Sequence, residues 1–284
     1  MVSRPIVQLV CNPDAGGYSS RRIDGLRAAW AAHGFDTLVC ESSARNGFTL
    51  VDDVARICIA GGDGTVRHVL TDPALRNAGK PVDIFPAGTI NLAAREWRTS
   101  RQPRRFVKRA IRREPRPVYP GTVNGTAFLV CASIGPDARA VANVSLALKK
   151  HIGRLAYGAS MIRSWLNWQR PQLTVEVDGE TIICEAVYIA KGRFYAGPWS
   201  FAPDARLDSP LLHVVALRRA RRRDYLAFML AMVLGRPSAM ANICCLQGRN
   251  VSVESDQEEL VQVDGDIAAS LPARFQVSGA PILA

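Results

Sequence analysis

The pattern of hydrophobic residues changes near residue 115, and this change limits the folds that the chain can adopt. Before that point, short apolar runs that fit strands alternate with segments of helical periodicity, as at residues 6–11 and 21–32. Such alternation predicts a mostly parallel sheet covered by helices. After that point, short runs rich in Val, Ile and aromatic residues follow one another. A run of strands behind an alternating half predicts a second, β-rich domain built as a sandwich.

These patterns place the expected elements along the chain. In the first half, strands are expected at residues 6–11, 36–40, 56–60 and 82–85, and helices at 21–32 and 66–70. In the second half, strands are expected at residues 126–134, 173–177, 181–190, 211–217, 250–253, 260–263 and 274–277, and helices at 147–168 and 222–234. The pairs Asn124-Gly125 and Asp178-Gly179 are typical of hairpin turns. We therefore predict an α/β domain at residues 1–117 and a β-rich domain at 118–284, whose last residues are placed to pack back toward the first.

Composition narrows the class of protein. With 48% hydrophobic and 21% charged residues, the chain is globular and not disordered. No apolar run reaches the roughly 18–20 residues that span a bilayer, and the N-terminus lacks the apolar core of a signal peptide. Seven cysteines without zinc-ligand spacing fit a reducing compartment, so we expect a cytoplasmic location.

The basic excess points to an anionic partner. The chain has 36 Lys and Arg against 25 Asp and Glu, a net charge of +11. Basic residues cluster at 98–116 and at 218–223, and the second cluster leads directly into the apolar helix expected at 222–234. That combination favours an anionic membrane surface as the partner. Nucleic acid is not expected, because the basic runs are not interleaved with aromatics and no nucleic-acid-binding motif occurs.

The sharpest functional motif is Gly61-Gly62-Asp63-Gly64-Thr65, directly after an apolar strand. Glycines at a strand end let the backbone approach a ligand closely. Backbone N–H groups in such a turn, followed by a helix, form an anion-binding concavity. An acid in a phosphate cradle would repel phosphate unless a metal or a proton donor lies beside it, so Asp63 is a candidate functional residue.

Two other loops share the features of this one. Residues 12–17 follow the first strand, and residues 86–91 follow the strand at 82–85. In a parallel sheet all three loops lie at the carboxyl ends of strands, where such folds bind ligands. The chain has no P-loop, no Gly-x-Gly-x-x-Gly dinucleotide motif and no protein-kinase signature, so these nucleotide-binding classes are excluded.

Together the three motifs resemble the catalytic family of diacylglycerol kinases, the lipid kinases that also include sphingosine and ceramide kinases. The first resembles the family's Asn-Pro-x-x-Gly, the second its Gly-Gly-Asp-Gly-Thr and the third its Pro-x-Gly-Thr-x-Asn-x-x-Ala. The likeness continues through Gly135-Pro136-Asp137-Ala138, Gly153-Arg154-Leu155-Ala156-Tyr157, the segment 202–208 and Val263-Asp264-Gly265-Asp266. It therefore covers nearly the whole chain in the family's order.

Four positions depart from the family's pattern. Leu92 stands where bacterial members often carry Asp, Lys191 where Asn is common, Ser209 where Gly is expected, and Asp266 where the family has Glu. The apolar residue at 92 implies a metal–water network unlike that of the bacterial diacylglycerol kinases. The same residue does not affect the nucleotide contacts that are expected of the third loop.

The resemblance implies an ATP- and Mg²⁺-dependent kinase that phosphorylates the hydroxyl of a diacylglycerol-, sphingosine- or ceramide-like lipid at the inner face of the membrane. The nucleotide-binding residues that it implies are Asn12, Gly16, Gly17, Gly61, Gly62, Gly64, Thr65, Gly88, Thr89 and Asn91. Asp264, or else Asp63, would be the general base, and Asp266 would support metal or water. Asp63 and Asp208 would bind the metal.

Two alternatives stay open at this stage. Gly-Gly-Asp-Gly also occurs in NAD kinases, so a phosphotransferase acting on a soluble substrate would share the nucleotide site. A nucleotide- or lipid-binding pseudoenzyme is kept open by Leu92. A homodimer is also left open.

Overall fold

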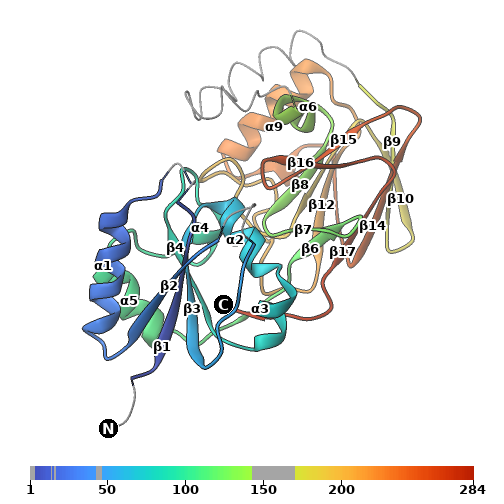
Figure 1. The fold of residues 1–284 in the computed structure, drawn as a ribbon. Helices are drawn as coiled ribbons and strands as arrows, with labels where there is room; N and C mark the ends of the chain where they lie inside the picture. The colour runs from blue at the N-terminus through green and yellow to red at the C-terminus, as the bar shows by residue number, and fades with distance from the viewer. Residues whose placement is uncertain (1–3, 14, 16, 43–46, 143–169) are drawn as a thin grey trace. The chain divides into compact units, whose positions relative to one another are not determined.

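The computed structural model describes residues 4–13, 15, 17–42, 47–142 and 170–284, and the chain divides into two compact units (Figure 1). Unit 1 comprises Met1–Tyr119 and Gly279–Ala284, and unit 2 comprises Pro120–Ser278. The boundary expected from the sequence falls between residues 117 and 118, and the division in the structure follows Tyr119. The end of the chain joins unit 1 through β5 (Pro117–Val118), which pairs with β18 (Ile282–Leu283).

Unit 1 contains a four-stranded parallel sheet in the order β2-β1-β3-β4. Its strands are β1 (Ile6–Cys11), β2 (Asp36–Glu41), β3 (Val54–Gly61) and β4 (Val82–Pro86). Its helices are α1 (Ser20–Ala31), α2 (Asp63–Leu70), α3 (Pro73–Ala78), α4 (Leu92–Glu96) and α5 (Pro103–Arg112). This arrangement confirms the parallel α/β domain predicted from the alternating first half of the chain.

Helices α1 and α5 pack together and bury their apolar sides with the sheet (Figure 1). Trp30 of α1 and Phe106 of α5 are buried, and the Phe106 ring meets Phe85 of β4 edge-on with centroids 5.2 Å apart. Helix α5 lies within the basic cluster at residues 98–116, for which no helix was predicted. It folds as a helix because Phe106, Val107 and Ala110 all face inward while the Arg and Lys side chains between them stay exposed.

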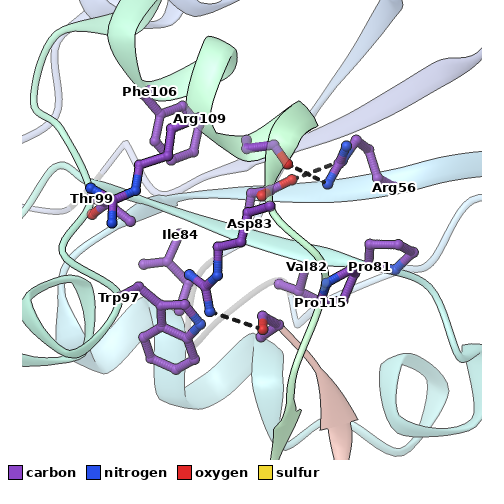
Figure 2. Close-up of a pocket in the computed structure, with 13 residues that line it drawn as sticks. Arg56, Pro81, Val82, Asp83, Ile84, Trp97, Thr99, Phe106, Arg109 and Pro115 are labelled. Carbon is purple, nitrogen blue, oxygen red and sulfur yellow. Dashed lines mark hydrogen bonds and ion pairs between the residues drawn. The ribbon is translucent and has the colours of Figure 1, made fainter.

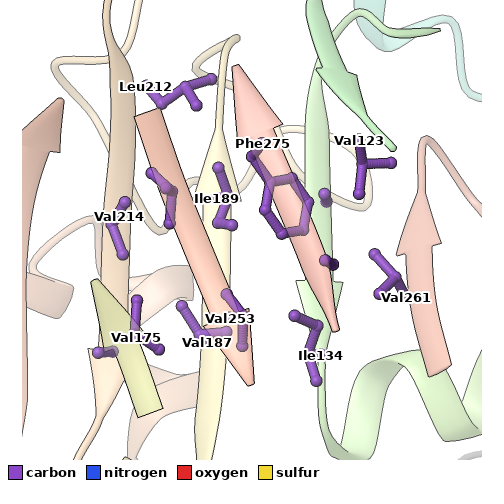
Figure 3. Packing of buried hydrophobic residues seen from close by; sticks show 14 of the residues in the cluster. Val123, Ile134, Val175, Val187, Ile189, Leu212, Val214, Val253, Val261 and Phe275 are labelled. Carbon is purple, nitrogen blue, oxygen red and sulfur yellow. The ribbon is translucent and has the colours of Figure 1, made fainter. Parts of the chain in front are cut away.

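Unit 2 is formed by two six-stranded antiparallel sheets, in the orders β10-β9-β14-β17-β6-β7 and β13-β12-β11-β8-β15-β16. The first sheet contains β6 (Gly121–Val123), β7 (Thr126–Phe128), β9 (Leu173–Val177), β10 (Glu180–Cys184), β14 (Asn250–Ser255) and β17 (Ala273–Val277). The second contains β8 (Cys131–Ile134), β11 (Ala186–Ala190), β12 (Leu212–Leu217), β13 (Ile243–Gly248), β15 (Leu260–Val263) and β16 (Asp266–Ser270). Buried side chains from both sheets form one hydrophobic cluster, which Figure 3 shows. The predicted β-rich sandwich is confirmed.

Both predicted hairpin turns are present. Asn124 and Asp178 have φ of 46° and 45°, and the glycine after each also has a positive φ. Two adjacent left-handed residues match the twist of the flanking strands, so these pairs close the β6–β7 and β9–β10 hairpins.

Two strands that the sequence analysis expected as single runs are each broken in two. The run at 126–134 divides into β7 and β8, because the N–H groups of Leu129 and Val130 turn to the carboxylate of Asp264. The run at 181–190 divides into β10 and β11 at Glu185, whose carboxylate accepts the N–H of Ala220 and pairs with Arg170. Polar contacts with residues far along the chain therefore interrupt both runs.

The described helical elements of unit 2 are α6 (Pro136–Ala142), α9 (Arg222–Val233) and the short η1 (Pro237–Ala239). The helix expected at 222–234 corresponds to α9, and Tyr225, Phe228 and Met232 anchor it in a second hydrophobic cluster. The helix expected at 147–168 lies outside the described residues. In the described parts of the chain, every helix is too short or too polar to cross a bilayer.

Candidate active site

The loops that follow β1, β3 and β4 meet at the carboxyl end of the unit 1 sheet. The side-chain amide of Asn12, after β1, donates to the hydroxyl of Thr65, at the start of α2, over 3.3 Å. Gly17 lies so close to the third loop that a Cβ atom there would stand 1.9 Å from the carbonyl oxygen of Ala87. The first loop thus contacts both of the others.

The second and third loops approach each other at two glycines. A Cβ atom on Gly88 would stand 2.4 Å from Cα of Gly62, and one on Gly62 would stand 3.2 Å from Cα of Gly88. Gly61 is equally confined, since its Cβ would stand 2.6 Å from Cβ of Thr65. The distances at Gly88 and Gly61 leave no room for a Cβ atom, so the loops meet there through their backbones.

Asn91 holds the third loop in its shape. Its φ of 56° is left-handed, its Oδ1 accepts the N–H of Gly88 at 2.7 Å, and its Nδ2 donates to the carbonyl of Gly88 at 2.6 Å. The side chain is buried, whereas Thr89 at the tip of the loop is exposed. Asn91 therefore shapes the loop from within.

Asp63 joins the second loop to the third. It is the first residue of α2, and its Oδ1 accepts the N–H of Ala93 in α4 at 2.9 Å. Burial raises the pKa of this carboxyl, and the N–H groups of Ala93, Leu92 and Asn91 oppose that rise. A cation beside Asp63 would relieve the same desolvation. The apolar Leu92 contributes its backbone here, although its side chain is no ligand.

Most of the predicted nucleotide-binding residues lie at the junction of the three loops. Asn12, Gly17, Gly61, Gly62, Thr65, Gly88 and Asn91 form the contacts described above, and Gly64 lies exposed beside them. Gly16 lies outside the described residues. A backbone-lined cradle at the start of a helix fits the phosphates of ATP, and one half-buried carboxylate together with phosphate oxygens fits Mg²⁺.

Asp264, the predicted general base, lies in the turn between β15 and β16 with a φ of 47°. Its carboxylate accepts three backbone N–H groups, from Leu129 at 2.7 Å, Val130 at 2.9 Å and Cys131 at 3.0 Å. Its own N–H donates to the carbonyl of Cys131 at 2.9 Å. The residue thus fastens the β15–β16 turn to the segment that leads into β8.

The two other predicted acids of unit 2 differ in their surroundings. Asp266 is half-buried at the first position of β16. Asp208 forms a two-pronged ion pair with the guanidinium of Arg206, both contacts measuring 2.9 Å. To bind a metal, Asp208 would have to leave Arg206. Among the described residues, no three His, Cys, Asp or Glu side chains gather into a metal-binding group.

Asp137 was singled out only as part of a family-like motif, yet it forms the centre of a buried polar cluster. Its two carboxylate oxygens accept the hydroxyls of Ser133 and Tyr195, both at 2.5 Å. Burial raises the pKa of Asp137 and, to well above its ordinary value, that of Tyr195. These partners make Asp137 an anchor between α6 and the strands. The motif Gly-x-Asp-Ala was the only sequence signal for it.

Unit 1 also contains a pocket whose lining residues are drawn in Figure 2. It lies near the amino ends of β3 and β4, where Arg56 and Asp83 form an ion pair of 2.8 Å. Arg113 donates to the carbonyl of Ala284 at 3.2 Å on the same side. None of the residues lining this pocket belongs to the loops at the carboxyl end, so it is not the nucleotide site.

A parallel sheet with glycine-bearing loops at its carboxyl edge, followed in the chain by an antiparallel sandwich, is a two-domain arrangement suited to binding phosphate groups. The profile of the diacylglycerol kinase catalytic domain matches residues 7–123, and that of the YegS C-terminal NAD kinase beta sandwich-like domain matches residues 130–282. The chain belongs to this diacylglycerol kinase family and is a lipid kinase, which confirms the resemblance drawn from its motifs. Membership implies ATP as the phosphate donor.

Named relatives agree with this assignment. A diacylglycerol kinase of Staphylococcus carnosus is 25% identical over 231 residues, which are 80% of this chain and 74% of that protein. A Pseudomonas aeruginosa protein named "Probable lipid kinase YegS-like" is 28% identical over 229 residues, 79% of this chain and 74% of that protein. The crystal structure of a diacylglycerol kinase from Bacillus anthracis has a TM-score of 0.77 at 20% identity, covering 98% of this chain and 96% of that one. The structural likeness supports the fold.

Proposed function

We propose that this kinase transfers the γ-phosphoryl group of ATP, with Mg²⁺, to the hydroxyl of a diacylglycerol-, sphingosine- or ceramide-like lipid at the cytoplasmic surface of an anionic membrane. The observation that carries the proposal is the meeting of three glycine-bearing loops, in which Gly88 packs against Gly62 and Gly17 against Ala87. A cradle of backbone N–H groups suits the phosphates of any nucleotide. The choice of a lipid as the acceptor rests on the family to which the chain belongs.

Phosphoryl transfer requires positioning, charge neutralisation and a group that takes the proton of the attacking hydroxyl. Bound ATP and Mg²⁺ supply the phosphoryl group and neutralise the charge on its oxygens. Asp63 is the side chain in the loops of unit 1 that would hold the cation. It would keep its hydrogen bond to Ala93 and use its remaining acceptor capacity for that purpose.

For the proton acceptor we choose Asp266 over Asp264. Three backbone N–H groups already donate to the Asp264 carboxylate and take up three of its roughly four acceptor positions, which leaves it little room to accept the proton of a hydroxyl. Asp266 stands two positions further along the same turn, half-buried at the start of a strand. In this proposal Asp266 takes the role of general base, which the sequence analysis gave to Asp264 or Asp63.

The substrate test offers the protein γ-labelled ATP and Mg²⁺ with a total lipid extract in one arm and NAD in another. We expect label in organic-phase lipid, whose identity mass spectrometry then gives. Label in NADP and none in lipid would support the NAD kinase alternative. ATP bound but never turned over in either arm would support the pseudoenzyme.

A second observation supports attachment to a membrane surface. Helix α9 buries one side in unit 2 and leaves a second apolar face open to solvent: Leu226 is 56% exposed, Leu230 59% and Leu234 67%. These positions recur at spacings of four, so they share one face of the helix. The exposed side chains of Arg221, Arg222 and Arg223 precede them at the start of α9. A basic helix end beside an apolar face suits an anionic leaflet.

Vesicle sedimentation tests this attachment. Binding to anionic vesicles should exceed binding to neutral ones and fall with added salt. Replacing the three arginines by Glu should weaken binding on the order of 10²-fold, at about 1 kcal/mol for each lost basic contact. Leu226→Ser with Leu230→Ser should weaken it further. Ile183→Ser is the matched control, because Ile183 is 58% exposed on β10, away from α9. Equal binding by all variants would contradict the proposal.

A further inference from the structure

Lys191 is a fully buried lysine in unit 2. It directly follows β11, and the sequence analysis noted it only as a departure from the family's pattern. An ammonium group taken out of water must find compensating oxygen partners, since its desolvation costs several kcal/mol. The partners of the Lys191 ammonium therefore indicate what this lysine does in the fold.

The Lys191 ammonium donates to three backbone carbonyls of the loop at residues 206–209. Its Nζ lies 2.6 Å from the oxygen of Ser209, 3.0 Å from that of Arg206 and 3.5 Å from that of Leu207. The same loop closes on itself through the N–H of Ser209, which donates to the carbonyl of Arg206 at 3.1 Å. Several carbonyl oxygens converging on one cation form the kind of ligand set that hard metal ions use.

The backbone of Lys191 connects this loop to the turn that holds Asp264. The N–H groups of Lys191 and Gly192 both donate to the carbonyl of Val130 at 2.8 Å, and the N–H of Val130 donates to Asp264 at 2.9 Å. One lysine thus spans from the 206–209 loop to the segment that fixes the β15–β16 turn.

We infer that the Lys191 ammonium is the resident cation of unit 2: it holds the 206–209 loop from within, in the role that a bound metal ion would otherwise take. The neighbouring carboxylate of Asp208 forms an ion pair with the guanidinium of Arg206, and both contacts measure 2.9 Å. The loop should accordingly need no metal. This inference does not depend on the proposed function, and its tests use the protein without nucleotide or lipid.

The first test compares Lys191→Met with the wild type. Methionine fills nearly the same volume but carries no charge and no N–H donor, so the carbonyls of Arg206 and Ser209 would be left buried without their partner. We expect the Tm to fall by about 10 °C. We also expect trypsin to cleave the chain faster after Arg206, and mass spectrometry measures the rate of that cleavage. A wild-type Tm and a wild-type cleavage rate in this variant would overturn the inference.

The second test is chemical rescue of Lys191→Ala, which leaves a cavity in front of the same carbonyls. The n-propylammonium ion replaces the atoms that this substitution removes, and it should raise the Tm of the variant and restore protection after Arg206. Tetramethylammonium controls for ionic strength, and 1-propanol controls for filling of the cavity without charge. Rescue by 1-propanol to the same extent, or no rescue by n-propylammonium, would refute a cation role.

A third measurement requires no variant of Lys191. The Tm of the wild-type protein without nucleotide should be the same in Mg²⁺, Ca²⁺, K⁺ and tetramethylammonium at equal ionic strength. A clear rise with Mg²⁺ or Ca²⁺ that persists in Asp63→Asn, which removes the carboxylate proposed for the Mg²⁺ of the nucleotide site, would overturn the claim that Lys191 takes the place of a metal.

Discussion

Gly88→Ala is expected to weaken ATP binding by at least roughly 10²-fold while leaving unit 2 folded. The new Cβ would stand 2.4 Å from Cα of Gly62 and 2.9 Å from Oδ1 of Asn91. Gly62 can yield only by moving its backbone, and Asn91 only by releasing the hydrogen bonds that shape the loop. Because a misplacement of about 1 Å costs on the order of 10²-fold at such sites, the phosphate cradle should fail.

Isothermal titration with a non-hydrolysable ATP analogue measures this effect, and a thermal unfolding scan shows that the protein remains folded. Gly279→Ala is the control within unit 1, because nothing lies within 4 Å of its Cβ and its φ is not left-handed. It should bind the analogue as the wild type does. Unchanged affinity in Gly88→Ala would remove the three-loop junction as the nucleotide site.

The parts of the fold that the sequence predicted are those that depend on local pattern. The first strand, residues 6–11, agrees with β1 because a buried parallel strand is a continuous apolar run bounded by Asn12-Pro13. The turn at Asp178-Gly179 follows from two residues that tolerate a left-handed backbone. The meeting of three glycine loops was also predictable, since parallel strands place their carboxyl ends on one edge.

The parts that the sequence could not predict depend on partners far along the chain. The break between β7 and β8 arises from Asp264, 135 positions after Leu129. The Lys191 ammonium donates to backbone carbonyls of Arg206 and Ser209. Every residue type carries such a carbonyl, so no sequence pattern indicates these partners. A buried lysine reads as an ordinary surface charge until its neighbours are known. The backbone donors of Asp264 were equally unpredictable, because they lie more than 130 positions away along the chain.

Asp266→Asn is expected to lower kcat for lipid phosphorylation by roughly 10²–10⁴-fold, the usual contribution of a general base, with little change in the KM for ATP. The amide keeps the size and shape of the side chain but cannot accept the proton of the hydroxyl. Asp266 is only half-buried, so the Tm should stay close to that of the wild type. Turnover with the lipid identified in the extract assay, together with a thermal scan, measures both quantities.

Asp264→Asn provides the contrast that separates the two acids of this turn. An amide there offers one oxygen where the carboxylate accepts from Leu129, Val130 and Cys131, and its NH₂ group would face donors. Leaving a buried donor without its acceptor costs about 1–3 kcal/mol, which lowers the Tm by several degrees. The activity of Asp264→Asn should fall only in proportion to the fraction of the protein that is folded. If Asp264→Asn instead kept its Tm and lost turnover while Asp266→Asn remained active, the base would be Asp264, because only a catalytic role separates activity from stability in that way.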